Sequence, residues 1–486
     1  MSAQSLIDQI LAQLECRVSS IFFNKAHVTE WLEQGYGLES DVSRNTAERL
    51  EMTLQNYTIE ISDLTFPEAG EPDEIPAHVN ILRKLKRVHF KNCRFECSQL
   101  ALPGVRLWFE NCTFSSDWLV TCSGYDDLYI ARGDTLFEHC SFAGTVSLTD
   151  INAEDDALRQ YDCLFFNCFA KALTVYRIGL KSHLWAVENL PQEGEPRLQE
   201  LTLLSVDARS PINLSHQVIE RVQITDSHIA DLNFYGGKAG TLTLMNTECN
   251  GGFSLELSEI GNLLFSDSTF NRPVNLSRMK AGNLDIKRVD FEKVLACNEV
   301  TITSGIALRS VRHAVAPDFV DIKLTDEAEA NSDRETFRLI KHSFEAVANR
   351  IEANRFFGLE MEAYRKELKR SHCLLSRERL LVEANHIISR HGQSYARPFL
   401  WLVLASLVNV ALIKSAMWPL PEFLTSSAVY QCLVGAGNAL NTFAQGFSVF
   451  SVLMRDGMEF ASLALALLMS TFVWHFLVAV RRFTRG

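Results

Sequence analysis

A short motif recurs through the middle of the chain at intervals of 20 or 21 residues. Each copy has an apolar first residue, a small or β-branched fourth residue and a mostly apolar sixth. The five clearest copies begin at Leu203, Ile224, Leu244, Phe265 and Ile286. Short alternating strands and polar turns separate the copies, so the period is not helical. A sustained period of this length predicts stacked supersecondary units, here a β-solenoid with one coil per repeat.

Earlier copies of the motif place a cysteine between two phenylalanines, as in FKNCRF from Phe90, FENCTF from Phe109 and FEHCSF from Phe137. We expect the fourth positions to form one inward column of compact side chains: Cys93, Cys112, Cys140, Val206, Ser227, Thr247, Ser268 and Val289. Because valine, serine and threonine replace cysteine there, packing explains the thiols better than metal binding or redox sensing. No cysteine pair has zinc-finger spacing, and we expect no metal ligands and no cofactor.

The 486 residues exceed one ordinary core, and the pattern predicts four regions. These are an N-terminal helical cap (1–55), the β-solenoid (56–315), a helical neck (330–395) and a membrane module (396–486). The chain has twelve cysteines and no secretory signal, which predicts a reducing compartment for its body. A net charge of −12 gives no support for nucleic-acid binding.

The membrane module is predicted from two apolar stretches, 399–418 and 460–480, each long enough to cross a bilayer. Arginines flank their outer ends, which predicts that both ends are cytoplasmic. The connection 423–454 carries no charge and could be a re-entrant segment, an interfacial helix or a third span. Charge symmetry favours the first two, and non-helical backbone at membrane depth would suggest an oligomeric pore. The candidate residues for a pore or membrane function are Asn438, Asn441, Gln445 and His475.

Three parts of the chain resemble one family. Degenerate five-residue units over about 60–310, nearest in ADLNF at Ala230 and GNLDI at Gly282, resemble pentapeptide-repeat proteins. That resemblance implies a right-handed quadrilateral parallel β-helix. The neck resembles that of membrane-bound bacterial pentapeptide-repeat proteins at Leu339, Lys341, Glu352, Ala353, Phe356, Glu360, Met361, Ala363 and Arg365. The two spans resemble a pore module fused to some members, but the potassium filter Thr-x-Gly-Tyr-Gly is absent.

The sequence contains none of the catalytic motifs for nucleophilic, metal-assisted or phosphoryl-transfer chemistry, so we expect no enzyme and no catalytic residues. The resemblance and the layout predict a multi-pass protein of the bacterial inner membrane, with a cytoplasmic β-helix that acts as a protein-binding or sensing scaffold. The alternative is a gated pore-forming or depolarising effector, for example in stress or antiphage defence. The expected partners are the bilayer, a cytoplasmic protein and further copies of the chain.

Overall fold

The computed structural model describes residues 58–66, 85–99, 106–121, 135–149, 162–180, 182–187, 197–371, 376–415, 428–445 and 459–484. The chain divides into a strand-rich unit, Met1–Asn331, and a helical unit, Ser332–Gly486. The predicted cap over 1–55 lies outside the described residues.

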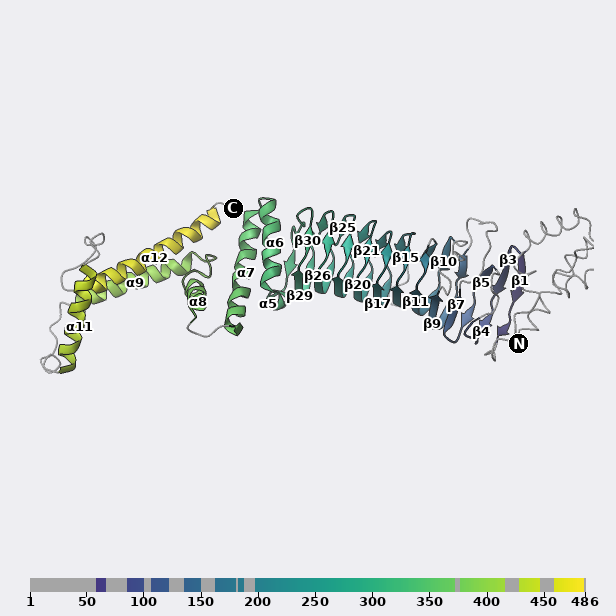
Figure 1. The fold of residues 1–486 in the computed structure, drawn as a ribbon, viewed down its shortest axis with the longest axis horizontal. Helices are drawn as coiled ribbons and strands as arrows, with labels where there is room; N and C mark the ends of the chain where they lie inside the picture. Colours follow the sequence, from purple (N-terminus) through teal and green to yellow (C-terminus); the bar gives the residue numbers. More distant parts are fainter. Residues whose placement is uncertain are drawn as a thin grey trace, which may run out of the picture. The chain divides into compact units, whose positions relative to one another are not determined.

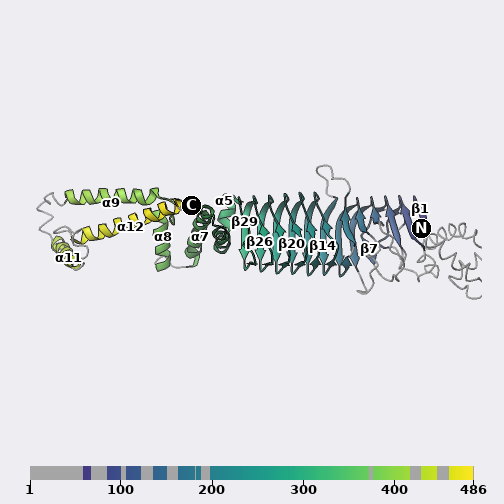
Figure 2. The same ribbon diagram turned by 90° about the horizontal axis from the view of Figure 1, so that it is seen from above.

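The described strands of the first unit form four sheets whose strand pairs are all parallel (Figures 1 and 2). Sheet A contains β1 (Thr58–Ser62), β3 (Arg87–Lys91), β5 (Leu107–Glu110), β8 (Thr135–Glu138), β10 (Cys163–Phe166) and β13 (His183–Ala186). Sheet C contains β12 (Gly179–Leu180), β15 (Asp207–Ala208), β18 (His228–Ile229), β21 (Glu248–Cys249), β24 (Thr269–Phe270), β27 (Asp290–Phe291) and β30 (Arg312–His313). Sheet D contains β16 (Ile212–Asn213), β19 (Leu232–Asn233), β22 (Phe253–Ser254), β25 (Val274–Asn275) and β28 (Leu295–Ala296).

Sheet B continues through the whole stack. It contains β2 (Thr65–Phe66), β4 (Arg94–Phe95), β6 (Thr113–Phe114), β9 (Ser141–Thr149), β11 (Phe169–Tyr176), β14 (Leu198–Leu204), β17 (Val218–Thr225), β20 (Lys238–Met245), β23 (Glu259–Ser266), β26 (Lys280–Lys287), β29 (Thr301–Arg309) and β31 (Lys323–Leu324), with β7 (Trp118–Thr121) paired to β9. A short helix, α5 (Asp326–Asn331), packs against β29.

The period of 20 or 21 residues is the separation in sequence between residues that pair on neighbouring strands. In sheet B, a row of buried residues runs in register through successive copies: Leu201, Val222, Leu242, Leu263, Leu284 and Ile306. Each copy therefore offers the same inward apolar residues to the next, and the backbone ladders align them. The expectation of a strand-rich fold with parallel sheets is confirmed.

The helical unit contains α6 (Arg334–Ala346), α7 (Arg350–Ser371), α8 (Arg377–Ser389), α9 (Ala396–Ser415), α11 (Ala428–Gln445) and α12 (Glu459–Thr484). The buried apolar face of α6 packs on Phe356 of α7, and the Phe344 and Phe356 ring centroids are 5.6 Å apart. Lys341 Nζ lies 2.8 Å from Glu360 Oε2, and both side chains are largely buried. This ion pair joins α6 to α7 at two positions that carry the neck resemblance.

Among the described residues, one helical stretch is long and apolar enough to cross a bilayer by length and composition, Phe460–Arg482 in α12. The apolar stretch found in α9, Ala396–Val408, is shorter. The middle of the uncharged connection, 428–445, is the helix α11. The second predicted span is thus helical as expected, and its crossing of a membrane and the multi-pass arrangement stay predictions.

Candidate functional site

Each motif copy turns a corner at a residue in the left-handed conformation. The residue just before the fourth position has a φ of 49° to 55° in the eight copies named above: Asn92, Asn111, His139, Ser205, Asp226, Asn246, Asp267 and Arg288. After glycine, asparagine and aspartate tolerate this conformation best, and they occupy five of these eight positions. The compact residue that follows then points into the core, and all eight predicted column residues are at most 3% exposed.

The structure divides these residues between two columns, which corrects the single column expected. Cys93, Cys112 and Cys140 lie at corners that lead from sheet A into sheet B, and Cys168 continues them. Val206, Ser227, Thr247, Ser268 and Val289 lie at corners that lead from sheet B into sheet C. The same local pattern serves both corners because each needs a left-handed residue followed by a small buried one.

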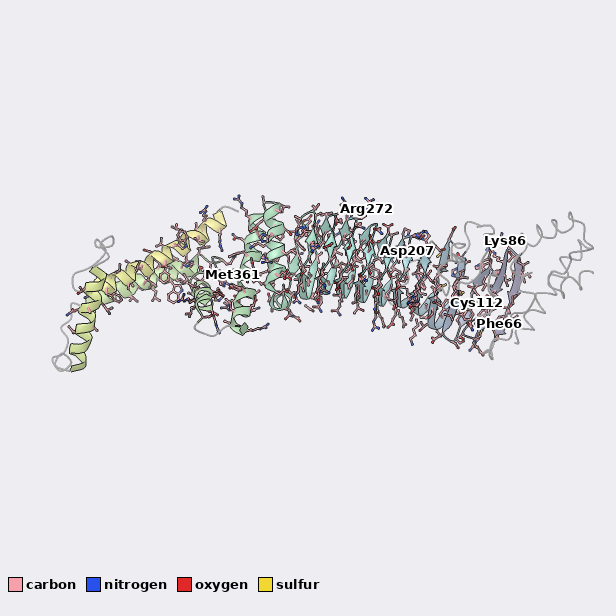
Figure 3. The ribbon with its side chains drawn as sticks, viewed as in Figure 1. Phe66, Lys86, Cys112, Asp207, Arg272 and Met361 are labelled. Carbon is pink, nitrogen blue, oxygen red and sulfur yellow. The ribbon has the colours of Figure 1, made fainter. Side chains whose placement is uncertain are left out.

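The buried thiols satisfy their hydrogen bonds within the core. Cys112 lies in the strand-rich unit (Figure 3), and its Sγ is 3.4 Å from each of the carbonyl oxygens of Phe90 and Glu110, which share the thiol hydrogen. The hydrogen-bonding interaction with the Cys140 thiol, which favours the protonated form of Cys112, and burial raise the pKa of Cys112 to about 12. A thiol that stays protonated is a poor nucleophile and a poor metal ligand, so the chemistry favours the packing interpretation.

Serine and threonine take over this role in the second column. Ser227 Oγ donates to the Thr225 carbonyl at 2.7 Å and accepts from the Val206 amide at 3.1 Å. Ser268 Oγ accepts from the Thr247 amide at 3.2 Å in the same way. The hydroxyls therefore link neighbouring copies through the core.

Polar side chains line the outer face of sheet B in rows across the copies. Glu259 pairs with Lys238 at 3.2 Å and with Lys280 at 3.0 Å, one lysine from each neighbouring strand. The pKa of Glu259 is lowered, chiefly by the hydrogen bond from Lys280 and then by the one from Lys238. In the next row, Asn283 donates to Asn262 at 2.8 Å. This face presents regularly spaced charges and amides.

A buried histidine, His89, lies in β3 of sheet A. The His89 ring stacks on Trp108 with centroids 3.7 Å apart, and its Nε2 lies 2.9 Å from Glu110 Oε2. Burial lowers the pKa of His89, while the carboxylates of Glu110 and Glu60 oppose that effect and Arg87 adds to it. The folded chain therefore holds His89 neutral at a pH where an unfolded histidine, with a pKa near ~6.5, begins to charge.

We expect His89 to make folding less stable in acid. The folded pKa lies below the unfolded one, so the contribution is complete above the unfolded value and is lost as pH falls through ~6.5. The variant His89→Phe keeps an aromatic ring on Trp108 and removes the titration. Thermal unfolding at about pH 7.5 and about pH 5 should show a larger drop in Tm for the wild type than for the variant. Equal drops in both proteins would contradict the assignment.

The predicted membrane-function residues lie on two helices. Asn438, Asn441 and Gln445 are on α11, and His475 is on α12. Asn441 Oδ1 accepts a hydrogen bond from the Phe460 amide at 3.0 Å, so it joins α11 to the first turn of α12. Asn438 is exposed, and its carbonyl oxygen accepts from Thr442 Oγ1 at 2.9 Å. The structure thus gives Asn441 a positioning contact, while a pore role stays a prediction.

The helical unit brings together a histidine and carboxylate cluster that no sequence motif marks. Glu362 on α7, His386 on α8 and His391 in the turn after α8 offer ligand atoms that all lie within 4.8 Å of one another. The two histidines are five residues apart and the carboxylate lies on another helix, so no local spacing signals them. Among the described residues, this cluster could hold a metal ion.

A scan of protein-family models and searches of curated proteins and of solved structures found no match for this chain.

Proposed function

We propose that this chain is a membrane-anchored scaffold, in which the parallel sheets close into a right-handed β-helix that binds a cytoplasmic protein. The observation that carries the proposal is a contrast between surfaces. Over 197–313, the exposed large apolar side chains are Met245 and Leu257. The helices instead expose many, on α9 and α12: Phe399, Leu400, Trp401, Val403, Leu404, Leu407, Val408, Phe460, Leu467, Leu468, Val473, Trp474 and Leu477.

An apolar surface of this extent needs a partner, because soluble chains rarely leave one in water. Lipid fits the length of α12. The 23 residues of Phe460–Arg482 make a helix of roughly 34 Å, against a bilayer core of ~30 Å. Arg481 and Arg482 in its last turn favour a cytoplasmic C-terminus. With α9 as a second span, the strand-rich unit would be cytoplasmic and the protein multi-pass in a bacterial inner membrane.

The strand-rich unit suits a binding role. Stacked repeats present extended, rigid surfaces on which a side chain recurs at every coil, ~4.8 Å apart. On sheet D, Asn213, Asn233 and Asn275 hold their Oδ1 atoms toward backbone amides two residues on. Such ordered polar rows can contact a protein at little cost in side-chain entropy. We propose a non-catalytic role, with further copies of the chain associating through the membrane helices.

The membrane anchor predicts a strong effect of charge in α12. Leu468 is 47% exposed and lies near the middle of the apolar stretch. Leu468→Arg should cost about 3 kcal/mol of insertion free energy and release protein from membranes. The matched control is Leu381→Arg, because Leu381 on α8 is 71% exposed and lies outside the apolar stretches. The measurement is the fraction retained by membranes after carbonate extraction, and a wild type that washes off would refute the anchor.

Scaffold and effector differ in what they do to the membrane. A photo-crosslinking residue at Thr243 on sheet B, Thr269 on sheet C or Asn233 on sheet D should trap a protein on one face and not on all three. A voltage-sensitive dye should show no depolarisation in bacteria that express the full chain. If the full chain depolarises the membrane and Asn441→Leu abolishes that effect, the scaffold proposal is wrong and the pore-forming effector is favoured. If none of the three positions crosslinks to a protein, the scaffold proposal is also contradicted.

A further inference from the structure

The cluster of Glu362, His386 and His391 contains polar atoms that the protein itself leaves unsatisfied. His391 is 3% exposed, and neither of its ring nitrogens has a hydrogen-bond partner in the described part of the chain. His386 Nδ1 also lacks one, although Glu362 Oε2 lies 3.5 Å away. Leaving a buried polar atom without a partner is costly, so three such nitrogens together indicate a missing ligand.

The backbone positions His391 without using its ring. Arg390, His391 and Gly392 are all left-handed, with φ of 49°, 60° and 81°. The Gly392 amide donates to Ser389 Oγ at 3.0 Å, and Arg482 Nη1 donates to the His391 carbonyl at 2.6 Å. The turn is therefore fixed by hydrogen bonds between its main chain and the side chains of Ser389 and Arg482, and the imidazole is left available inside the helical unit.

The carboxylate is oriented in a similar way. Arg365 Nη2 donates to Glu362 Oε1 at 2.9 Å, which leaves Oε2 as the oxygen toward His386. The rings of His386 and His391 have centroids 5.4 Å apart and an interplanar angle of 53°. Two imidazole nitrogens and one carboxylate oxygen thus converge from α7, α8 and the turn that follows α8.

We propose that Glu362, His386 and His391 bind one divalent transition-metal ion, with Zn²⁺ as the best fit. Two histidines and one carboxylate are a common zinc ligand set, and three protein ligands leave a fourth position open to water. Imidazole ligands also suit Co²⁺, Ni²⁺ and Cu²⁺, whereas Mg²⁺ and Ca²⁺ prefer oxygen. Arg365 and Arg482 place positive charge nearby, so we expect weaker binding than at a closed cysteine–histidine site.

The bound ion would tie α7 to the turn that leads from α8 into α9. It is independent of the scaffold proposal, because it concerns the interior of the helical unit and needs neither a partner nor a membrane. Its expected consequence is a metal-dependent gain in stability, since an ion that binds only the folded state stabilises it by mass action.

The test uses the full chain, purified in detergent without a histidine tag and stripped with a chelator. Titration with Co²⁺ should give the visible absorption of a tetrahedral nitrogen–oxygen site at one equivalent, and Zn²⁺ should displace it. His386→Ala and Glu362→Gln should each weaken binding at least about tenfold and remove the rise in Tm with Zn²⁺. Glu362→Gln keeps the side-chain shape, which guards against misfolding as the explanation.

The matched control is His342→Ala, because His342 is an exposed histidine on α6 that pairs with Glu345 at 2.9 Å. It should bind Co²⁺ like the wild type. The proposal is overturned if the wild type gives no cobalt spectrum, or if Glu362→Gln and His386→Ala bind as tightly as His342→Ala.

Discussion

Replacing Gly261 with alanine should destabilise the strand-rich unit by about 3 kcal/mol, because a methyl group has no room there. A Cβ at Gly261 would lie 2.5 Å from the carbonyl oxygen of Gly240 in the preceding copy. Real side chains do not approach backbone that closely, so the strands would have to separate.

The same close approach of a glycine to the preceding strand recurs in successive copies, so the strands cannot move apart at one glycine without disturbing their neighbours. A Cβ at Gly240 would meet the Glu220 carbonyl oxygen at 2.7 Å, and one at Gly282 would meet that of Gly261 at 2.3 Å. Gly240, Gly261 and Gly282 occupy equivalent positions in β20, β23 and β26. The residues before and after each glycine are paired with the neighbouring strand, but the glycines themselves are not. Moving one strand away from its neighbour would break ladder hydrogen bonds on both sides of the glycine.

The control for this substitution is Gly179→Ala in β12. A Cβ at Gly179 would meet nothing within 4 Å, so we expect a change of at most about 0.5 kcal/mol. Urea unfolding followed by circular dichroism gives both free energies of unfolding. Similar values for the two alanine variants would show that the glycine row is not a close contact between copies.

The period of the repeat could be predicted from the sequence because it follows from hydrophobic residues that stack in register. Which pair of sheets each copy connects at its corner could not be predicted from the sequence. FENCTF and FSDSTF look alike, yet Cys112 turns from sheet A into sheet B and Ser268 turns from sheet B into sheet C. Both corners demand a left-handed residue and then a compact one, so local sequence cannot distinguish them. The residue before the fourth position signals that the chain turns there, because asparagine or aspartate fills five of the eight positions, but it does not signal which sheet follows.

In the helical unit, composition predicts an apolar helix, but the sequence does not predict which side chains meet between helices. The apolar stretch in α12 could be predicted from composition, since burial in lipid needs only length and hydrophobicity. The cluster of Glu362, His386 and His391 could not, because packing of α7 against α8 brings its members together across a separation of 29 residues, from Glu362 to His391. No helical period or motif links Glu362 on α7 to His391 in the turn that follows α8.

Truncating Phe109 to alanine should cost about 3–5 kcal/mol, the usual range for a fully buried phenylalanine. Phe109 is 1% exposed and sits inside a stack of rings contributed by sheet A. Its ring centroid lies 5.1 Å from that of Phe90 and 5.0 Å from that of Phe137, in stacked geometry. It also meets Phe114 of sheet B edge to face at 5.6 Å. One truncation therefore removes contacts with three copies of the motif.

The matched control is Phe169→Ala, because Phe169 is 39% exposed and should cost much less. Double replacement of Phe109 and Phe137 should cost less than the sum of the single changes, since the two rings are in contact. A stack of repeats is held together by neighbour contacts, so a defect at Phe109 should loosen the early copies before the regular copies after Leu198. Hydrogen exchange should then rise first in β3, β5 and β8. Uniform exchange along the stack would instead show that the strand-rich unit unfolds as one cooperative body.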